Sequence, residues 1–514
     1  MARRVLVVGF DGATWELLVP YSKDGTMPKL AGLMEKSRWG NLRSTLPPVT
    51  APAWASLATG KNPGKTGVFA FYTPLDSIDS FRPISSLDVQ ADTLPEFLER
   101  AGLKVHVINL PTFSYPTKIE GTVLGDILCP PEAVVNPKPL LEQQVFRSYR
   151  SIPNMSLKGN LPRYIRDIRL LEAARFKCAA ELLRSSWDFV FVMFSGVDWV
   201  QHELYGELLA GTLSPATEEA RGFFRDLDLY VGWFMDQLHP EDYLLLVSDH
   251  GFERIRGTIS VNHWLMQQGY LTQKRGASGL SRLARRIPAV AIPNQALSLL
   301  STHPWLWTMG RRLWRATAGN TGFSGHIVPN PETTRAFAQD FTNGIYINPK
   351  RRFKKGILDE EEESRVTKEL ASKLAALTTS GFIKGCVPAD EVYEGPFTHN
   401  ACDLVIKPAD RGINYTTDLV IDDTPRNGHS TNGIYLLHGP EAQPGHGRTA
   451  SIYDVFPTVL SIFGFSSPGD LDGVSMIGNN SRSDESQSTP QSRRVLTPDE
   501  EDTIRARLRA LGYS

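Results

Sequence analysis

The sequence predicts an α/β fold in which helices cover both faces of a mostly parallel sheet. Short apolar runs at residues 5–10, 189–194 and 243–247 indicate buried strands, and they alternate with segments of helical periodicity at 163–186 and 216–238. This alternation is typical of parallel sheets, because parallel strands need a long crossover connection, usually a helix. The 514 residues are enough for more than one domain, or for one domain with insertions.

The remaining predicted elements extend this alternation to residue 464. Further helices are expected at residues 27–36, 93–100, 359–377 and 452–464, and further strands at 104–110, 344–348 and 431–438. We expect Asp92 to cap the helix at 93–100, because a carboxylate before the first turn accepts backbone N–H groups. Gly102 is placed to end that helix. The strand at 344–348 is expected to resume the main sheet.

Residues 254–331 differ in composition and are predicted to form an inserted basic cap or lid. The stretch holds no Asp or Glu but ten Lys and Arg, and aromatic residues such as Trp264, Tyr270 and Trp305 are interleaved. A solvated pair of basic helices would explain this pattern, and so would a surface for an anionic substrate or for acidic lipid headgroups. The absence of acids over so long a span favours the functional explanation slightly.

The chain is therefore expected to consist of four parts. These are a main domain at 1–253 and 332–477, the cap at 254–331, a flexible linker at 478–494 and a C-terminal helix at 495–514. The linker is rich in Asn, Ser, Arg and Gln, a composition that resists packing into a core. The last helix opens with Thr497-Pro498-Asp499-Glu500, which is a capping box with proline at the first helical position.

Composition excludes several classes of function. A net charge of −1 gives no sign of a nucleic-acid polymer as partner. The four cysteines are scattered and form no CxxC pair, which argues against a disulfide framework or a cysteine zinc site and fits a reducing compartment. The first apolar run ends at Asp11, too early for a signal peptide. No run approaches the roughly 20 apolar residues of a membrane span, so a cytoplasmic location is predicted.

The stretch from Asp11 to Gly60 organises the predicted chemistry. Asp11 follows the first apolar strand, where open α/β sheets place their functional residues. Thr50 precedes a helix-like run that Gly60 ends, and a helix N-terminus favours an anion through its free N–H groups and its dipole. We interpret Asp11 as a metal ligand and Thr50 as a nucleophile that attacks a phosphoryl group.

Three further clusters could supply the remaining ligands. Asp198 and His202 lie four residues apart just after a strand, so on a helix they would share one face. Asp249 and His250 are adjacent between an apolar strand and a glycine; both can reach one site because the strand has ended there. His429 precedes the strand at 431–438, and on composition alone His399, His438 and His446 compete with it.

Together these residues suit two divalent cations. Carboxylate and hydroxyl oxygens mixed with imidazoles point to zinc first, and to manganese or iron next. Two metals about 4 Å apart can clamp a phosphoryl oxygen and lower the pKa of a hydroxyl. A threonine needs such activation, because its free hydroxyl is a poor nucleophile at neutral pH.

These clusters resemble the alkaline phosphatase superfamily, and within it the type I phosphodiesterase/nucleotide pyrophosphatase branch. The matching blocks are, in chain order, the strand leading to Asp11, Thr50 ahead of its helix, the Asp198/His202 pair, Ser248-Asp249-His250-Gly251, and Gly428-His429. The runs from Gly9 to Trp15 and from Thr50 to Trp54 also resemble a group of predicted phosphohydrolases or phosphomutases. The resemblance implies an alkaline-phosphatase-like three-layer sandwich with an inserted cap.

The resemblance also implies a role for each residue. Asp198, His202 and His429 would ligate one metal, and Asp11, Thr50, Asp249 and His250 the other. Thr50 would form a covalent phospho-enzyme, which water hydrolyses or a second hydroxyl accepts. The resemblance selects His429 over His438.

Some positions depart from the family pattern. Nucleotide pyrophosphatases carry an Asn three residues after the nucleophile, where this chain has Ala53. The lost contact to a phosphate oxygen must come from elsewhere, and Lys61, Lys65 or the basic cap are the candidates for substrate binding. Sulfatases need a Cys-x-Pro-x-Arg type of motif, which is absent around Thr50, so a sulfatase is disfavoured. The glycines near the N-terminus form no GxGxxG fingerprint, so a dinucleotide-binding protein is disfavoured as well.

The sequence favours hydrolysis of a phosphodiester or phosphomonoester. A phosphomutase or phosphoryl transferase, acting for example on lipid or glycan headgroups, would use the same metals and a similar nucleophile. A non-enzymatic binding module would predict a lost ligand, and none is obviously lost. A third class is a protein that acts at a membrane surface through residues 254–331.

Overall fold

The computed structural model of the protein describes most of the chain. The described residues are 3–130, 133–274, 329–339, 342–379, 383–408, 411–414, 421–422, 425–478, 482–483 and 496–512. Most of the predicted cap, residues 275–328, and most of the predicted linker, residues 484–494, lie outside them. None of the described helices is both long and apolar enough to cross a membrane.

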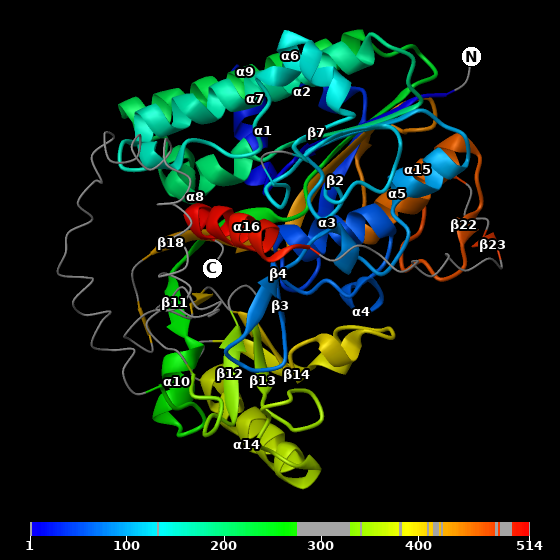
Figure 1. Ribbon diagram of the computed structural model, residues 1–514. Coiled ribbons are helices and arrows are strands. Elements are labelled where there is room, and N and C mark those ends of the chain that lie inside the picture. Colours follow the sequence, from blue (N-terminus) through cyan, green and yellow to red (C-terminus); the bar gives the residue numbers. More distant parts are fainter. Residues whose placement is uncertain are drawn as a thin grey trace, which may run out of the picture.

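A large sheet forms the centre of the molecule (Figure 1). Among the described residues its strands run in the order β20-β2-β19-β9-β1-β8-β5-β6-β7, with β20 (Gly445–His446) and β7 (Val135–Asn136) at the two edges. The parallel strands are β1 (Val5–Phe10), β8 (Phe189–Phe194), β9 (Tyr243–Val247), β5 (Val105–Ile108) and β6 (Thr122–Leu124). β19 (Asn432–His438) lies antiparallel between β9 and β2 (Arg38–Arg43). The predicted mostly parallel sheet is thus confirmed, with β19 as an antiparallel member.

Helices cover both faces of this sheet (Figure 1). One layer contains α1 (Trp15–Lys23), α2 (Pro28–Glu35), α7 (Leu161–Leu183), α8 (Gly196–Leu209) and α9 (Pro215–Asp236). The other contains α3 (Thr50–Thr59), α5 (Leu94–Arg100) and α15 (Val455–Phe463). In β1, Leu6 and Val8 enter the first core and Val5 and Val7 the second, because successive side chains of a strand point to opposite faces. The three-layer sandwich is confirmed.

A second sheet, of four antiparallel strands, lies beside the main one. Its order is β12 (Ala336–Gln339), β13 (Gly344–Ile347), β15 (Leu404–Pro408) and β14 (Ile383–Pro388), and α14 (Glu360–Thr379) packs against it. The prediction that residues 344–348 resume the main sheet is therefore wrong. An apolar run identifies a buried strand but not the strand with which it pairs.

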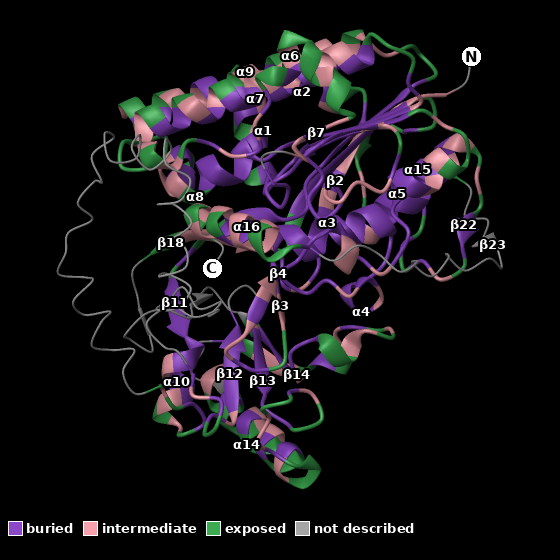
Figure 2. Cartoon of the chain, in the orientation of Figure 1, coloured by how far each residue is buried: buried purple, intermediate pink, exposed green. Residues whose placement is uncertain are grey.

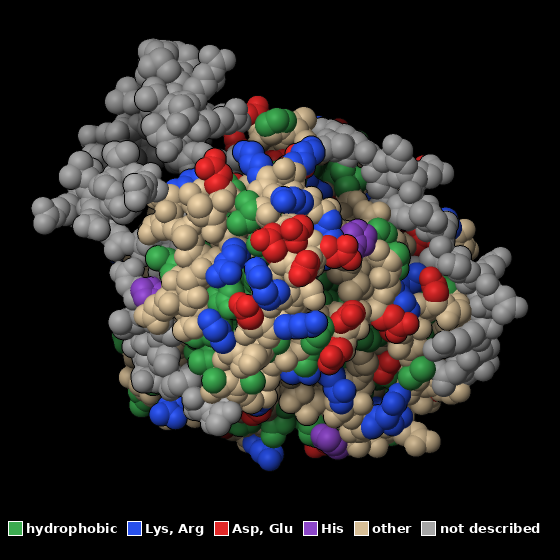
Figure 3. All heavy atoms as spheres, turned by 90° about the horizontal axis from the view of Figure 1, so that it is seen from below, with side chains coloured by type: hydrophobic (Ala, Val, Ile, Leu, Met, Phe, Trp, Pro, Cys, Tyr) green, Lys and Arg blue, Asp and Glu red, His purple; other side chains and the backbone are tan. Residues whose placement is uncertain are grey.

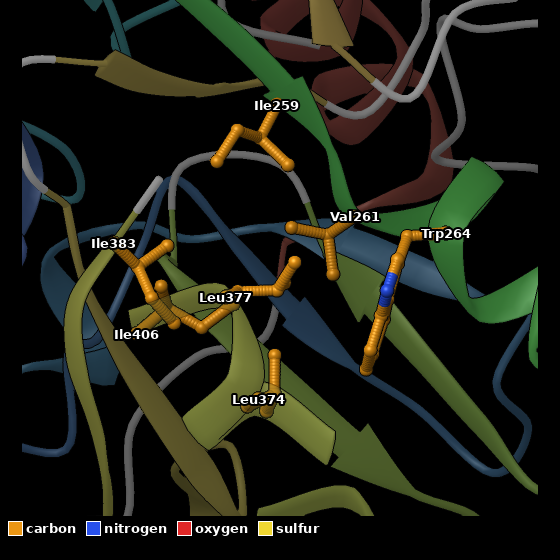
Figure 4. Close-up of a pocket in the computed structure, with 7 residues that line it drawn as sticks. All are labelled: Ile259, Val261, Trp264, Leu374, Leu377, Ile383 and Ile406. Atoms are coloured by element: carbon orange, nitrogen blue, oxygen red, sulfur yellow. The ribbon is translucent and has the colours of Figure 1, made fainter. Parts of the chain in front are cut away.

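A small apolar cavity lies between α14, the second sheet and two elements that precede it, β11 (Gly257–Ser260) and α10 (Val261–Gln267) (Figure 4). Trp264, Leu374 and Ile406 are among the side chains that line the cavity. From below, the surface around α14 shows acidic and basic side chains interspersed (Figure 3). No large area of a single charge is visible among the described residues on that face.

Residues 254–274, the described start of the predicted cap, belong to the body of the protein. β10 (Gly251–Ile255) pairs with β18 (Arg426–Ser430), and β11 (Gly257–Ser260) and α10 (Val261–Gln267) follow. Trp264 and Tyr270 are buried, not displayed on a surface. The predicted boundary at residue 254 is therefore wrong, since strand pairing continues past it.

Two helix ends test the capping predictions. α5 is capped by Thr93, which forms a capping box with Glu96, whereas the Asp92 carboxylate pairs with Arg100; the predicted cap was thus one residue too early. α16 (Pro498–Leu511) begins after Thr497 and ends at Gly512, as predicted. The helix packs against the main domain (Figure 2), and its side chains Ile504 and Leu508 are fully buried.

Candidate metal centre

Three aspartates meet at one edge of the main sheet. Asp11, Asp198 and Asp249 each follow a neighbouring strand, β1, β8 and β9 respectively. The carboxyl ends of parallel strands lie at the same edge, so residues from distant parts of the chain converge there. All three side chains are buried, at 3% exposed or less. Burial of three carboxylates without compensating positive charge is unfavourable.

The first group consists of Asp198, His202 and His429. Asp198 and His202 lie one turn apart on α8, and His429 comes from β18, which the β10 pairing brings over that helix. Asp198 Oδ1 lies 3.3 Å from His202 Nε2 and 3.2 Å from His429 Nε2. The two Nε2 atoms are 3.0 Å apart. Three ligand atoms therefore converge on one point. His438, in contrast, contacts Ser37.

The second group consists of Asp11, Asp249 and His250. His250 Nε2 lies 3.3 Å from Asp249 Oδ2 and 3.7 Å from Asp11 Oδ1. The Thr50 side chain is also fully buried. The His250 ring stacks on the His429 ring with centroids 3.8 Å apart, so the two groups adjoin.

The histidine tautomers suit cation binding. His429 Nδ1 donates to the Pro48 carbonyl at 3.0 Å, and His250 Nδ1 donates to the Gly251 carbonyl at 3.1 Å. A carbonyl only accepts, so in each neutral ring the proton sits on Nδ1 and Nε2 presents a lone pair. Backbone carbonyls commonly orient metal-binding histidines in this way.

The electrostatics of the two groups differ. Burial raises the pKa of Asp249 from 3.8 to about 7, and burial with the Asp249 and Asp198 charges raises the pKa of Asp11 well above its usual value. Burial also opposes ionisation of Asp198, but His202 and His429 outweigh it and lower the pKa of Asp198 well below its usual value. Burial and His429 lower the pKa of His250, which stays neutral. Without cations the second group therefore retains protons that cations would displace.

The pKa of Asp249 gives a testable pH dependence. Its folded-state pKa of about 7 exceeds the usual 3.8, so the folded state binds more protons than the unfolded state between these values. The stability contribution is complete below about pH 4 and is lost as the pH rises through about 7. We expect the Tm of chelator-treated protein to fall between about pH 4 and pH 7 and to level off above that. Thermal melts should show a flatter profile for Asp249→Asn; equal slopes would contradict the assignment.

The residues present fit cation binding. Ligand atoms of Asp198, His250 and His429, and of Asp11, Asp249 and His250, lie within 4.8 Å of one another in each set. Asp11 Oδ1, Asp249 Oδ2 and His250 Nε2 are buried and have no hydrogen-bond partner among the described residues. Buried acceptors of this kind need a positive partner.

Comparison with known proteins agrees with this geometry. Residues 5–434 match the family described as type I phosphodiesterase / nucleotide pyrophosphatase. The chain belongs to this family. It is accordingly an enzyme that hydrolyses phosphoric ester bonds, of the phosphodiesterase or pyrophosphatase type. No curated protein matches the chain.

Solved structures share the fold of this phosphodiesterase-family protein at low identity. Phosphonoacetate hydrolase from Sinorhizobium meliloti 1021, in complex with phosphonoacetate, is 14% identical with a TM-score of 0.56, over 90% of this chain and 96% of that chain. A mutant of alkaline phosphatase PafA is 14% identical with a TM-score of 0.51, over 93% and 100%. At these identities the likeness concerns the fold alone.

Thr50 occupies the position that the sequence predicted. It is the first residue of α3, after the extended residue Val49, and Gly60 ends the helix with φ 68°. Thr50 Oγ is buried and has no hydrogen-bond partner among the described residues. The first N–H groups of a helix are unused within it, so this end of α3 combines a hydroxyl with a positive dipole.

Lys61 and Lys65 are not placed to bind the substrate of this phosphodiesterase-family protein. Their ammonium groups pair with Asp470 and Asp472, each at 2.5 Å. They follow the C-terminal end of α3, whereas Thr50 begins it, and a helix of ten residues is about 15 Å long. The predicted substrate-binding role is therefore not supported: proximity in sequence does not mean proximity across a helix.

Replacing Lys61 by alanine provides a test. Because Lys61 fastens the loop that carries Asp470, we expect Lys61→Ala to lower the Tm but to change the KM for a phosphate ester by less than about twofold. Lys65→Ala should behave alike. A KM that rises tenfold or more in steady-state assays would restore the predicted role.

Two polar side chains that were not predicted as site residues connect the segments around the centre. Gln201 Nε2 donates to the Gly12 carbonyl at 2.7 Å. Asn427 Nδ2 donates to the His202 carbonyl at 3.0 Å. Both lie beside predicted ligands, and Gln201 shares a helix face with Asp198 at a spacing of three. A polar residue on an otherwise buried helix face was the signal available in the sequence.

Proposed function

We propose that this protein is a two-cation phosphohydrolase that cleaves a phosphate ester through a covalent phospho-threonine at Thr50. One observation carries the proposal. Thr50 Oγ, Asp11 Oδ1, Asp249 Oδ2 and His250 Nε2 are all buried without a hydrogen-bond partner among the described residues. Leaving one such polar atom unsatisfied costs about 1–3 kcal/mol. Three of these atoms belong to the second group, and the Pro48 carbonyl, which accepts from His429 Nδ1, places the segment that leads into α3 beside the centre. Together they indicate a site built for cations and a substrate.

The donor set supports two divalent cations, with zinc preferred and manganese as the alternative. Asp198, His202 and His429 would hold one, and Asp11, Thr50, Asp249 and His250 the other. When bound, the cations would neutralise the carboxylates, lower the pKa of the Thr50 hydroxyl and polarise the phosphoryl group.

The residues of the chain then perform the transfer. Thr50 Oγ attacks phosphorus, the bond from Oγ to phosphorus forms, and the bond from phosphorus to the leaving oxygen breaks. The Thr50 hydroxyl gives up its proton in this step, and the leaving oxygen, which departs as an alkoxide, takes up one proton in return. Water then attacks phosphorus, the bond to Thr50 Oγ breaks, and the hydroxyl is regenerated. The free N–H groups at the start of α3 face the negative charge of the phosphoryl group.

Three chromogenic esters test the proposal. Hydrolysis of bis-p-nitrophenyl phosphate, p-nitrophenyl phosphate and a nucleotide p-nitrophenyl ester should be measured on chelator-treated protein and after zinc or manganese is restored. We expect cation-dependent release, and a phosphoryl adduct on Thr50 in acid-quenched samples by mass spectrometry. Ala53 replaces the family's Asn, so the nucleotide ester should show no strong advantage. No release from any ester, with both cations bound, would overturn hydrolysis in favour of a mutase or transferase.

A further inference from the structure

Gln201 is a fully buried amide on the helix that carries the first group. It lies on α8, between Asp198 and His202 in sequence, and is 0% exposed. Its Nε2 donates to the Gly12 carbonyl at 2.7 Å. Gln201 therefore ties α8 to the turn that follows β1. That turn carries Asp11, which belongs to the second group.

The N–H of Gly12 extends this connection to the second group. Gly12 N–H donates to Asp249 Oδ1 at 3.1 Å, which leaves Asp249 Oδ2 toward His250. Gly12 has φ +69°, a backbone conformation that favours glycine. A Cβ at this position would lie 3.2 Å from Asp198 Oδ1 and 3.2 Å from His250 Cε1. The backbone of Gly12 therefore lies between the two groups, where a side chain would be tightly packed against both.

We propose that Gln201 is a positioning residue that couples the two cation positions through the backbone of Gly12, whose carbonyl and N–H belong to the two peptide groups on either side of its Cα. The inference rests on the proposed function, because it requires that both groups bind cations. Gln201 fixes the Gly12 carbonyl, and the turn thereby aims the Gly12 N–H at Asp249. Without Gln201 the buried carbonyl loses its donor, which is unfavourable. A glycine turn can rotate to recover a partner, and Asp249 then loses the hydrogen bond that orients it.

The chain offers a matched control for the loss of a buried amide. Gln339 is 5% exposed and its Nε2 donates to the Tyr72 carbonyl at 2.9 Å. Like Gln201, it has an Oε1 without a partner among the described residues. It lies on β12 in the second sheet. Gln339→Met thus removes a similar hydrogen bond and should lower the Tm to a similar extent, without touching the cation positions.

Calorimetric titration of chelator-treated protein with zinc tests the coupling. We expect the wild type and Gln339→Met to take up two cations with equal affinities. Gln201→Met should bind one of the two cations about tenfold or more weakly, the usual effect of removing a residue that orients a metal ligand. If Gln201→Met fails to fold, Gln201→Asn, which keeps the amide but shortens its reach, takes its place. Wild-type affinities in either folded variant would overturn the proposal.

A double-mutant comparison separates positioning from general destabilisation. Gln201 acts through Asp249, so in an Asp249→Ala background Gln201→Met should leave the affinity for the remaining cation unchanged. A further loss in that background would overturn the proposed path. Uptake of fewer than two zinc ions by the wild type would overturn both this inference and the proposed function. Uptake of two zinc ions without hydrolysis of any ester would overturn the proposed function but not this inference.

Discussion

Replacing Thr50 by alanine should lower kcat for a phosphate diester by roughly 10⁴-fold or more, the scale on which enzymes lose turnover without their nucleophile. The fold should persist, because Thr50 is the first residue of α3 and its hydroxyl makes no hydrogen bond to another described residue. The Asp198 group contains no atom of Thr50 and should still bind its cation. Steady-state kinetics with metal analysis of the same sample measures both quantities.

Thr59 provides the control for this substitution. It is fully buried on the same helix, nine residues later, and its Oγ donates to the Ala55 carbonyl at 2.8 Å. Thr59→Ala removes the same atoms at the other end of α3 and should retain turnover close to that of the wild type. If Thr50→Ala also retains it, a water molecule is the attacking group, and the phospho-threonine is excluded.

Asp249→Ala should remove one cation per chain and lower turnover by roughly 10³-fold or more. The reason is that the second group loses one of its two carboxylate ligands. The variant should keep the cation of the Asp198 group. The loss of the pKa-raised carboxylate should also stabilise the cation-free protein above pH 7. Metal analysis, kinetics and thermal melts of one preparation test these expectations together.

Asp126 is the matched control. Its carboxylate is equally buried, follows β6 in the same sheet, and has a pKa raised by burial to about 6. It belongs to neither ligand group. Asp126→Ala should alter stability but not cation content. If Asp249→Ala retains two cations and turnover, the assignment of the second group is wrong.

The parts of the centre that follow strands could be predicted from the sequence. Asp11, Asp198 and Asp249 each terminate an apolar run, and the geometry of parallel sheets brings such positions together. His429 is different, because it reaches the centre through the pairing of β18 with β10. No local pattern encodes which strands pair over such a distance, and the family resemblance was needed to choose it.

The wrong predictions share the same physical origin. The strand at 344–347 was recognised, but its partners β12 and β15 made it part of another sheet. Lys61 is close to Thr50 in sequence, but the length of α3 separates them. Gln201 was overlooked because its contribution is a hydrogen bond to a backbone carbonyl, and local patterns do not reveal such long-range partners.

The late position of His429 in the chain also has a consequence for biosynthesis. The second group needs only residues 11 to 250, whereas the first waits for residue 429 and for the strand β19 that borders β9. Domains of nascent chains fold as their residues leave the ribosome, so a chain still in synthesis holds Thr50 and every proposed ligand except His429 once residue 250 has emerged. We therefore expect a chain truncated before β18 to lack one ligand of the first group and to hydrolyse phosphate esters poorly.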